Sequence, residues 1–241
     1  MQITWLGHST IYLKTTAGTR ILIDAWIENN PACPPEWHAK LRELGVDIIM
    51  LTHGHTDHCV DTAALYYDTQ AQVVCQYDAV EWLTYQNVAN ESILALNKGG
   101  TVRINDVRIT MVNAQHSNSW PTSVGPRMFG SEVGYVLRVD NDITVYAAGD
   151  TNVMADMAII ADLYHPDVAM IPIGDVYTMG PYEAAYAMQL LKSAAVLPIH
   201  HSTFPGLPGT PAQFSAELAL RGVVCDVLNL APGQTIAQGT K

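Results

Sequence analysis

The chain has 241 residues, of which 49% are hydrophobic and 15% charged, and its formal net charge at pH 7 is −11. This length supports a sizeable core in one large domain or in two closely packed halves. The 12 lysines and arginines form no basic run, which argues against binding to nucleic acid or to an anionic membrane surface.

Targeting signals and disulfides are not expected. The stretch Met1–Leu6 lacks a charged segment followed by an apolar one, and no apolar run approaches the roughly 18 residues that span a bilayer. The cysteines form no C-x-x-C pair, so reduced thiols in the cytoplasm are expected. Cys59, directly after His58, is expected to be a small apolar filler rather than a soft metal ligand. The cysteines are Cys33, Cys59, Cys75 and Cys225.

Apolar and β-branched runs in the first part of the chain predict a region rich in strands. The expected strands cover 3–6, 10–14, 20–24, 46–51 and 72–76. Helices are expected at 36–44, 58–68 and 78–87, and a Pro-rich loop at 29–35. A hairpin is expected around Asn105 and Asp106, with its two strands at 101–104 and 107–113.

The remaining chain repeats this order after an irregular segment at 117–130, which is either a functional lid or a plain surface loop. Strands are expected at 133–139, 144–148, 167–171, 195–199 and 223–227, and helices at 152–161, 181–191 and 211–220. Hairpins thus lead into β-α units twice, which predicts two similar halves packed face to face.

The run from His53 to His58 carries the strongest chemical signal in the chain. Three histidines and one aspartate lie within six residues, directly after a buried strand, where α/β proteins place their chemistry. His53 and His55 are two residues apart in extended chain and point the same way, so both reach one ion. If a helix begins near Thr56, Asp57 and His58 face a second position. Gly54 is expected to permit a tight turn. Imidazole with carboxylate suits zinc, iron, manganese, nickel or cobalt.

Three more candidate positions also follow predicted strands. His116 comes after the strand at 107–113, and Asp150 follows the strand at 144–148. His200 follows the strand at 195–199, and because side chains alternate, only one of His200 and His201 is expected to point inward. Asp150 has an alternative role as the N-cap of the helix at 152–161.

Together these residues resemble the metallo-β-lactamase fold superfamily of metal-dependent hydrolases. The pattern His-x-His-x-Asp-His at 53–58, followed by His116, Asp150 and His200, carries this resemblance over essentially the whole chain. Further segments are similar to the UPF0173 metal-dependent hydrolases, a group related to the ascorbate-6-phosphate lactonase branch. These segments are Trp5–Ser9, Ile173–Asp175 with Thr178–Pro181, and Pro198–His200 with Thr203–Pro205.

The resemblance implies an α/β fold, a four-layer αβ/βα sandwich of two mixed β-sheets flanked by helices. One hydrolase domain would cover residues 1–241, with pseudo-halves at about 1–116 and 131–241. The resemblance also implies two divalent metal ions, with zinc favoured and manganese, iron or nickel also suited. His53, His55 and His116 would bind the first ion and Asp57, His58 and His200 the second, with Asp150 bridging both.

The resemblance brings Asp24, Asp175 and His8 near the site, and the 117–130 segment adds Arg127. Asp24 and Asp175 are expected to support the site without binding metal. His8 either lines the site or is a structural turn histidine. Arg127 is the best candidate for contacting an anionic group of the substrate. His201-Ser202 departs from the Tyr-Asn that is frequent in similar sequences, which leaves the substrate contacts open.

The expected function is hydrolysis of a small ester, lactone or phosphodiester by a metal-activated hydroxide, with Asp57 as the catalytic residue that holds the nucleophile. The absence of basic clusters favours a small molecule over a long nucleic acid. The 117–130 segment and Tyr177–Tyr182 are candidate pocket walls. The alternatives are a redox di-iron protein of the same fold and a metal-binding module without catalysis. The chain is expected to act in the cytoplasm, with a homo-oligomer as a weaker expectation.

Overall fold

The computed structural model of the protein describes residues 1–239, and their strands form two large mixed sheets. The first sheet has the strand order β16-β1-β2-β3-β4-β5-β6. Strands β1 to β3 pair antiparallel, whereas β3 to β6 pair parallel. These strands are β1 (Gln2–Trp5), β2 (Ile11–Lys14), β3 (Arg20–Ile23), β4 (Ile48–Met50), β5 (Gln72–Gln76), β6 (Ile93–Leu96) and β16 (Thr235–Ala237).

The second sheet has the order β15-β14-β13-β12-β11-β8-β7 and repeats the change from antiparallel to parallel pairing. Strands β7, β8, β11 and β12 pair antiparallel, and β12 to β15 pair parallel. These strands are β7 (Thr101–Ile104), β8 (Val107–Asn113), β11 (Val133–Val139), β12 (Thr144–Ala147), β13 (Val168–Pro172), β14 (Ala195–Ile199) and β15 (Asp226–Val227).

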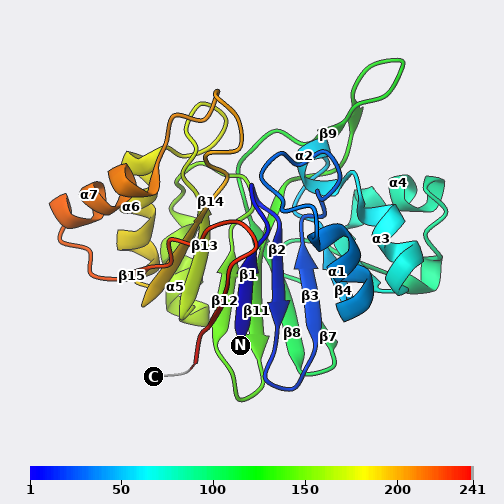
Figure 1. Ribbon diagram of the computed structural model, residues 1–241, viewed down its shortest axis with the longest axis horizontal. Helices are drawn as coiled ribbons and strands as arrows, with labels where there is room; N and C mark the ends of the chain where they lie inside the picture. The colour runs from blue at the N-terminus through cyan, green and yellow to red at the C-terminus, as the bar shows by residue number, and fades with distance from the viewer. Residues whose placement is uncertain (240–241) are drawn as a thin grey trace.

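The two sheets pack face to face, and helices cover their outer surfaces (Figure 1). Side chains alternate between the two faces of β3, so both faces of the sheet are apolar. Ile21 and Ile23 belong to the cluster between the sheets, whereas Leu22 belongs to the cluster on the outer face of the first sheet. On the second sheet, Tyr135 belongs to the central cluster and Val136 to the outer one. The central cluster thus holds the two sheets together, and each outer cluster holds helices on a sheet. These four layers confirm the expected αβ/βα sandwich.

Helices α1, α3 and α4 lie on one side of the molecule and α5 to α7 on the other (Figure 1). Because each sheet is covered by helices on its outer face and by the other sheet on its inner face, the parallel strands are almost entirely apolar. None of the helices in residues 1–239 is long and apolar enough to cross a membrane. The helices are α1 (Trp37–Leu44), α2 (Thr56–Cys59), α3 (Thr62–Thr69), α4 (Val80–Tyr85), α5 (Asp156–Tyr164), α6 (Pro181–Leu191) and α7 (Pro211–Leu220).

Two predicted helices differ from the structure for identifiable reasons. The helix expected at 58–68 divides into α2 and α3, because Asp61 between them accepts hydrogen bonds from the backbone of Ile27 and Glu28 at 2.6 and 2.8 Å. The helix expected at 152–161 begins only at Asp156. The preceding residues stay extended, since Asn152 N–H donates to the carbonyl of Gln115.

The 117–130 segment contains a two-stranded hairpin, β9 (Ser119–Trp120) and β10 (Arg127–Met128), that the sequence did not predict. Its tip projects away from the body of the molecule (Figure 1). Its base is anchored, because the Asn118 side chain accepts from Gly54 N–H at 2.8 Å and donates to the carbonyl of Phe129 at 3.2 Å. Strands β6 and β16 were also missed.

Candidate metal centre

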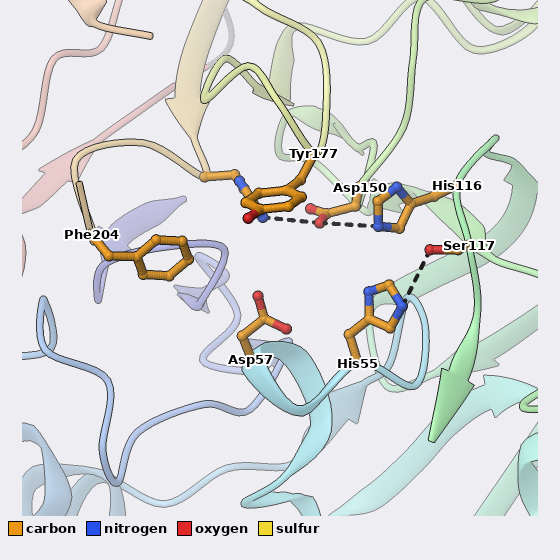
Figure 2. A pocket seen from close by; sticks show the side chains of 8 residues that line it. His55, Asp57, His116, Ser117, Asp150, Tyr177 and Phe204 are labelled. Carbon is orange, nitrogen blue, oxygen red and sulfur yellow. Dashed lines mark hydrogen bonds and ion pairs between the residues drawn. The ribbon is translucent and has the colours of Figure 1, made fainter. Parts of the chain in front are cut away.

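The candidate ligands converge at one edge of the sandwich, just beyond the carboxyl ends of strands. The metal loop follows β4, His116 follows β8, Asp150 follows β12 and His200 follows β14. His8 belongs to the turn between β1 and β2. Strand ends that are remote in sequence thus supply a single cavity, whose walls are drawn in Figure 2.

The loop after β4 has the predicted conformation. Helix α2 begins at Thr56 with extended backbone at His55, so His53 and His55 project together, with 3.0 Å between His53 Nε2 and His55 Nδ1. Gly54 is needed for close approach rather than for a left-handed turn, because a Cβ there would lie 2.4 Å from the Phe129 ring.

Two groups of donor atoms lie around this loop, and a third overlaps both. The first contains His53, His55 and His116, the second contains His8, Asp57, His58 and His200, and the third contains His53, His58 and Asp150. Within each group, the donor atoms lie within 4.8 Å of one another. The sequence had grouped these residues in the same way, except that it left His8 between a site role and a structural one.

Asp150 lies between the two groups. Its Oδ2 is 3.0 Å from His200 Nε2, 3.3 Å from His58 Nε2, 3.7 Å from His116 Nε2 and 4.0 Å from His53 Nε2. Its Oδ1 is buried and has no hydrogen-bond partner among residues 1–239. The predicted alternative role of Asp150 as a helix N-cap is wrong, because α5 starts after Ala155.

Asp24 controls the proton positions on two of the histidines. Its Oδ2 lies 2.8 Å from His58 Nδ1 and accepts from the Thr52 hydroxyl at 2.8 Å, while its Oδ1 accepts from Thr52 N–H at 2.9 Å. An ionised carboxylate only accepts, so His58 Nδ1 carries the proton. The Thr52 hydroxyl donates its only proton to Asp24. It must therefore accept a hydrogen bond from His53 Nδ1–H, 2.9 Å away. Both imidazoles therefore present the Nε2 lone pair to the cluster.

A buried relay of side chains also reaches Asp57. His8 Nε2 lies 3.0 Å from Asp57 Oδ2, and His8 Nδ1 lies 2.9 Å from the Thr203 hydroxyl. Burial lowers the pKa of His8 to about 4, so its ring is neutral near pH 7. Because the Asp57 carboxylate accepts, the His8 Nε2–H donates, and the Thr203 hydroxyl shares its single proton between His8 Nδ1 and the carbonyl of His201, 3.2 Å away.

The charges of the cluster call for a cation at its centre. Burial lowers the pKa of His53 well below its usual value, and it also lowers the pKa values of His55 and His116. Burial acts in the same direction on His58, but Asp150 and Asp24 outweigh it and raise its pKa well above the usual value. A proton is thus drawn to His58 between two buried carboxylates, where a metal ion would supply the same positive charge.

The donor set fits divalent metal ions by its chemistry. His58 Nε2 is buried without a hydrogen-bond partner in the described chain and lies 3.3 Å from a carboxylate oxygen, so either a proton or a metal ion has to supply positive charge between the two atoms. Imidazole nitrogen and carboxylate oxygen are ligands that zinc and manganese accept. The outward nitrogens of His53 and His58 are held by Thr52 and Asp24, as the outer shell of metal sites requires.

Other candidates lie outside these groups. His201 stacks on Trp5 with ring centroids 4.9 Å apart, so His200 is the histidine of the pair that faces Asp150. Cys59 is buried and its thiol faces the carbonyl of His55. Asp175 is exposed in the turn after β13, and Arg127 lies on exposed β10 rather than among the residues that line the cavity.

The sequence reasoning missed the residues that orient the cluster from behind. Thr52 and Thr203 bond to His53 and His8 through single hydroxyl groups. Both threonines stand next to motifs that the sequence singled out, but their type gives no signal of a role. Their contribution depends on a partner from another strand end.

Comparisons with known proteins identify related chains. The model of the family described as "Beta-lactamase superfamily domain" matches residues 2–200. A "UPF0173 metal-dependent hydrolase" of Roseiflexus sp. (strain RS-1) is 44% identical over 235 residues, which are 98% of this chain and 96% of that protein. A protein of the same name from Roseiflexus castenholzii (strain DSM 13941 / HLO8) is 43% identical with the same coverage. Among solved structures, Igni18, a metallo hydrolase from Ignicoccus hospitalis KIN4/I, matches with a TM-score of 0.88 and 29% identity, covering 100% of this chain and 99% of Igni18.

Proposed function

The chain belongs to the UPF0173 metal-dependent hydrolases of the β-lactamase superfamily, and from this premise we propose that its cluster holds two divalent metal ions and hydrolyses a small ester, lactone or phosphodiester. In this proposal, His53, His55 and His116 hold the first ion, and Asp57, His58 and His200 hold the second. Asp150 bridges the two. Zinc is the metal that this donor set favours.

A single observation carries the proposal. The buried Asp150 carboxylate has four imidazole Nε2 atoms within 3.0–4.0 Å of its Oδ2 and an Oδ1 without a partner in the described chain. Two of those imidazoles have their other nitrogen protonated by the network of Asp24, so their Nε2 atoms face the Asp150 carboxylate and positive charge is needed between them. Such an arrangement is unfavourable unless cations occupy the space between the donors.

Two divalent ions bound there would lower the pKa of a water toward about 7 and offset the negative charge that develops on the substrate oxygen. Asp57 lines the cavity and its side chain is 28% exposed, so it can take the proton of the attacking water. His8 fixes one Asp57 oxygen by donating from Nε2, which aims the other at the cavity. We therefore assign His8 a positioning role and not ligation.

The test is a screen of lactones, carboxylic esters and phosphodiesters with metal-replete protein, beside elemental analysis of bound metal. Asp150→Ala is expected to lose bound metal and turnover together, because it removes the carboxylate between the two groups. Asp162→Ala serves as the matched control, since Asp162 is exposed on α5 and belongs to none of the donor groups. Full turnover by an Asp150→Ala protein that carries no metal would refute the proposal. We further expect a small-molecule substrate and a cytoplasmic location.

A further inference from the structure

The cavity above the cluster has an unusual wall. It has a volume of about 290 Å³, and five of its eight lining residues belong to the candidate metal centre. The other three are Ser117, Tyr177 and Phe204. The Ser117 hydroxyl lies 3.4 Å from the His55 ring and is thus close to the metal donors. Tyr177 and Phe204 therefore provide the surface for the part of a substrate outside the reacting group.

This wall offers no positive charge of its own. No lysine or arginine of residues 1–239 lines the cavity, and Arg127, the predicted anion contact, lies on exposed β10 opposite Trp120. The lining residues outside the metal centre, Ser117, Tyr177 and Phe204, have no charged side chain. An anionic substituent outside the reacting group would find no counter-charge in this wall.

Tyr177 is held at the cavity by a strained turn. Tyr177 N–H donates to the carbonyl of Asp175 at 2.6 Å, and Val176 between them has a φ of +59°. This γ-turn is rare, and a β-branched residue at its centre is unfavourable. The Tyr177 side chain is 58% exposed, so the turn, more than packing, fixes its place. Strain of this kind typically persists where it serves a site.

Phe204 reaches the cavity from the loop after β14. Its ring lies 5.6 Å from the ring of His8, so it packs against the relay that holds Asp57. Figure 2 shows the rings of Tyr177 and Phe204 bordering the same opening as the Asp57 carboxylate. A molecule whose reacting carbonyl faces Asp57 would therefore place its remaining atoms against both rings.

We propose that Tyr177 and Phe204 form an aromatic clamp for the uncharged, apolar part of the substrate, which makes the substrate an uncharged carboxylic ester or lactone. This inference rests on the proposed hydrolytic function and narrows it. In the reaction, a water oxygen forms a bond to the acyl carbon and the acyl C–O bond breaks. The proton of the water passes through Asp57 to the leaving alkoxide, giving an acid and an alcohol.

The experiment compares four substrates, using metal-replete protein. Phenyl acetate is the uncharged aryl ester, 4-carboxyphenyl acetate is its anionic counterpart, and methyl acetate lacks the ring. Bis(4-nitrophenyl) phosphate tests the phosphodiester class. Wild-type kcat/KM is expected to be at least about 10-fold higher for phenyl acetate than for the carboxylated ester.

Tyr177→Ala and Phe204→Ala should each raise the KM for phenyl acetate by about 3- to 10-fold, the range of one aromatic contact, and should reduce kcat/KM less for methyl acetate, which has no ring for the clamp to hold. Tyr182→Ala is the matched control, because Tyr182 is also exposed, at 61%, and does not line the cavity. Equal losses on both esters, or a preference for the anionic ester or the phosphodiester, would overturn the clamp.

Binding of phenylacetone, which replaces the ester oxygen of phenyl acetate with a methylene, separates the clamp from the chemistry. Calorimetry should show weaker binding to Tyr177→Ala than to wild type, by a similar factor. Binding that depends on Tyr177 in a protein that hydrolyses none of the esters would support the clamp and refute the proposed hydrolysis. Hydrolysis of phenyl acetate with no effect of either substitution would do the reverse.

Discussion

Replacing Asp24 with asparagine is expected to weaken metal binding without unfolding the protein. The amide fits the same space, and its oxygen can still accept from Thr52 N–H as Asp24 Oδ1 does at 2.9 Å. The amide nitrogen then takes the place of Oδ2, where it donates to His58 Nδ1 instead of accepting from it. The neutral His58 ring must move its proton to Nε2, and the lone pair that faces Asp150 is lost.

The same change also reaches His53. The Thr52 hydroxyl loses its acceptor on residue 24 and becomes free to donate to His53 Nδ1, 2.9 Å away. Substitutions of outer-shell partners typically reduce metal affinity by about 10- to 100-fold, which corresponds to about 1.4–2.7 kcal/mol. Since Asp24 supports one histidine from each donor group, both binding steps are expected to weaken.

Titration of metal-free protein with Zn²⁺ against a competing chelator measures this loss directly. Asp61→Asn is the matched control, because Asp61 is a carboxylate in the same region that accepts only from backbone N–H groups, those of Ile27 and Glu28. Circular dichroism and thermal unfolding would verify that both variants fold. Wild-type affinity for Zn²⁺ in folded Asp24→Asn, or equal losses of affinity in the two variants, would refute the idea that Asp24 sets which nitrogen of His58 and His53 carries the proton.

Three further predictions test other contacts. Thr203→Val removes the hydroxyl that is hydrogen-bonded to His8 Nδ1. Steady-state kinetics should show kcat lowered by about 5-fold with KM unchanged. A change in KM alone would contradict the positioning role of His8. Tyr135→Phe leaves the buried carbonyl of Leu51 without its 2.6 Å hydrogen bond. Urea unfolding should show a loss of about 1–3 kcal/mol in the free energy of unfolding. No measurable loss would show that this hydrogen bond between the sheets is unimportant. Hydrogen bonds from Arg20 lower the pKa of the partly exposed Asp47, so this pair stabilises the fold above the unfolded pKa of about 3.9 and loses its effect as the pH falls through the folded value. Asp47→Asn should therefore cost about 0.5–1 kcal/mol in unfolding free energy at pH 6 and less at pH 3, and equal costs at the two pH values would argue against the pair.

Sequence patterns predicted the fold well where the hydrophobic periodicity and the positions of turn residues agree. Hairpin β7–β8, strand β14 and helices α6 and α7 lie where the apolar runs and turn residues put them. Predictions failed where a distant partner decides the local structure. Asp61 interrupts a helix by bonding to residues 27 and 28, and β16 exists only because it pairs with β1 across more than two hundred residues of sequence. Neither partner is visible in a local window.

The candidate site shows the same division. Histidines and aspartates at strand ends can be recognised because their chemistry is rare and their location recurs. The roles of His8, Thr52 and Thr203 follow instead from which atom donates and which accepts across strand ends that are distant in sequence. Arg127 was the natural anion contact by charge alone, yet it lies on an exposed hairpin strand and does not line the cavity.

The edge of the sandwich that carries the cluster is also where the backbone is least relaxed. His8, Asp24 and His200 all have left-handed backbone, with φ of 54°, 53° and 55°. Each such residue costs of order 1 kcal/mol, and the turns are joined by the hydrogen bond from His200 N–H to the carbonyl of His8 at 2.9 Å. The apolar layer between the sheets supplies the stability that tolerates this strain and the buried carboxylates of Asp24 and Asp150. Because bound cations would offset the remaining electrostatic cost, metal binding and folding stability should be linked in this protein.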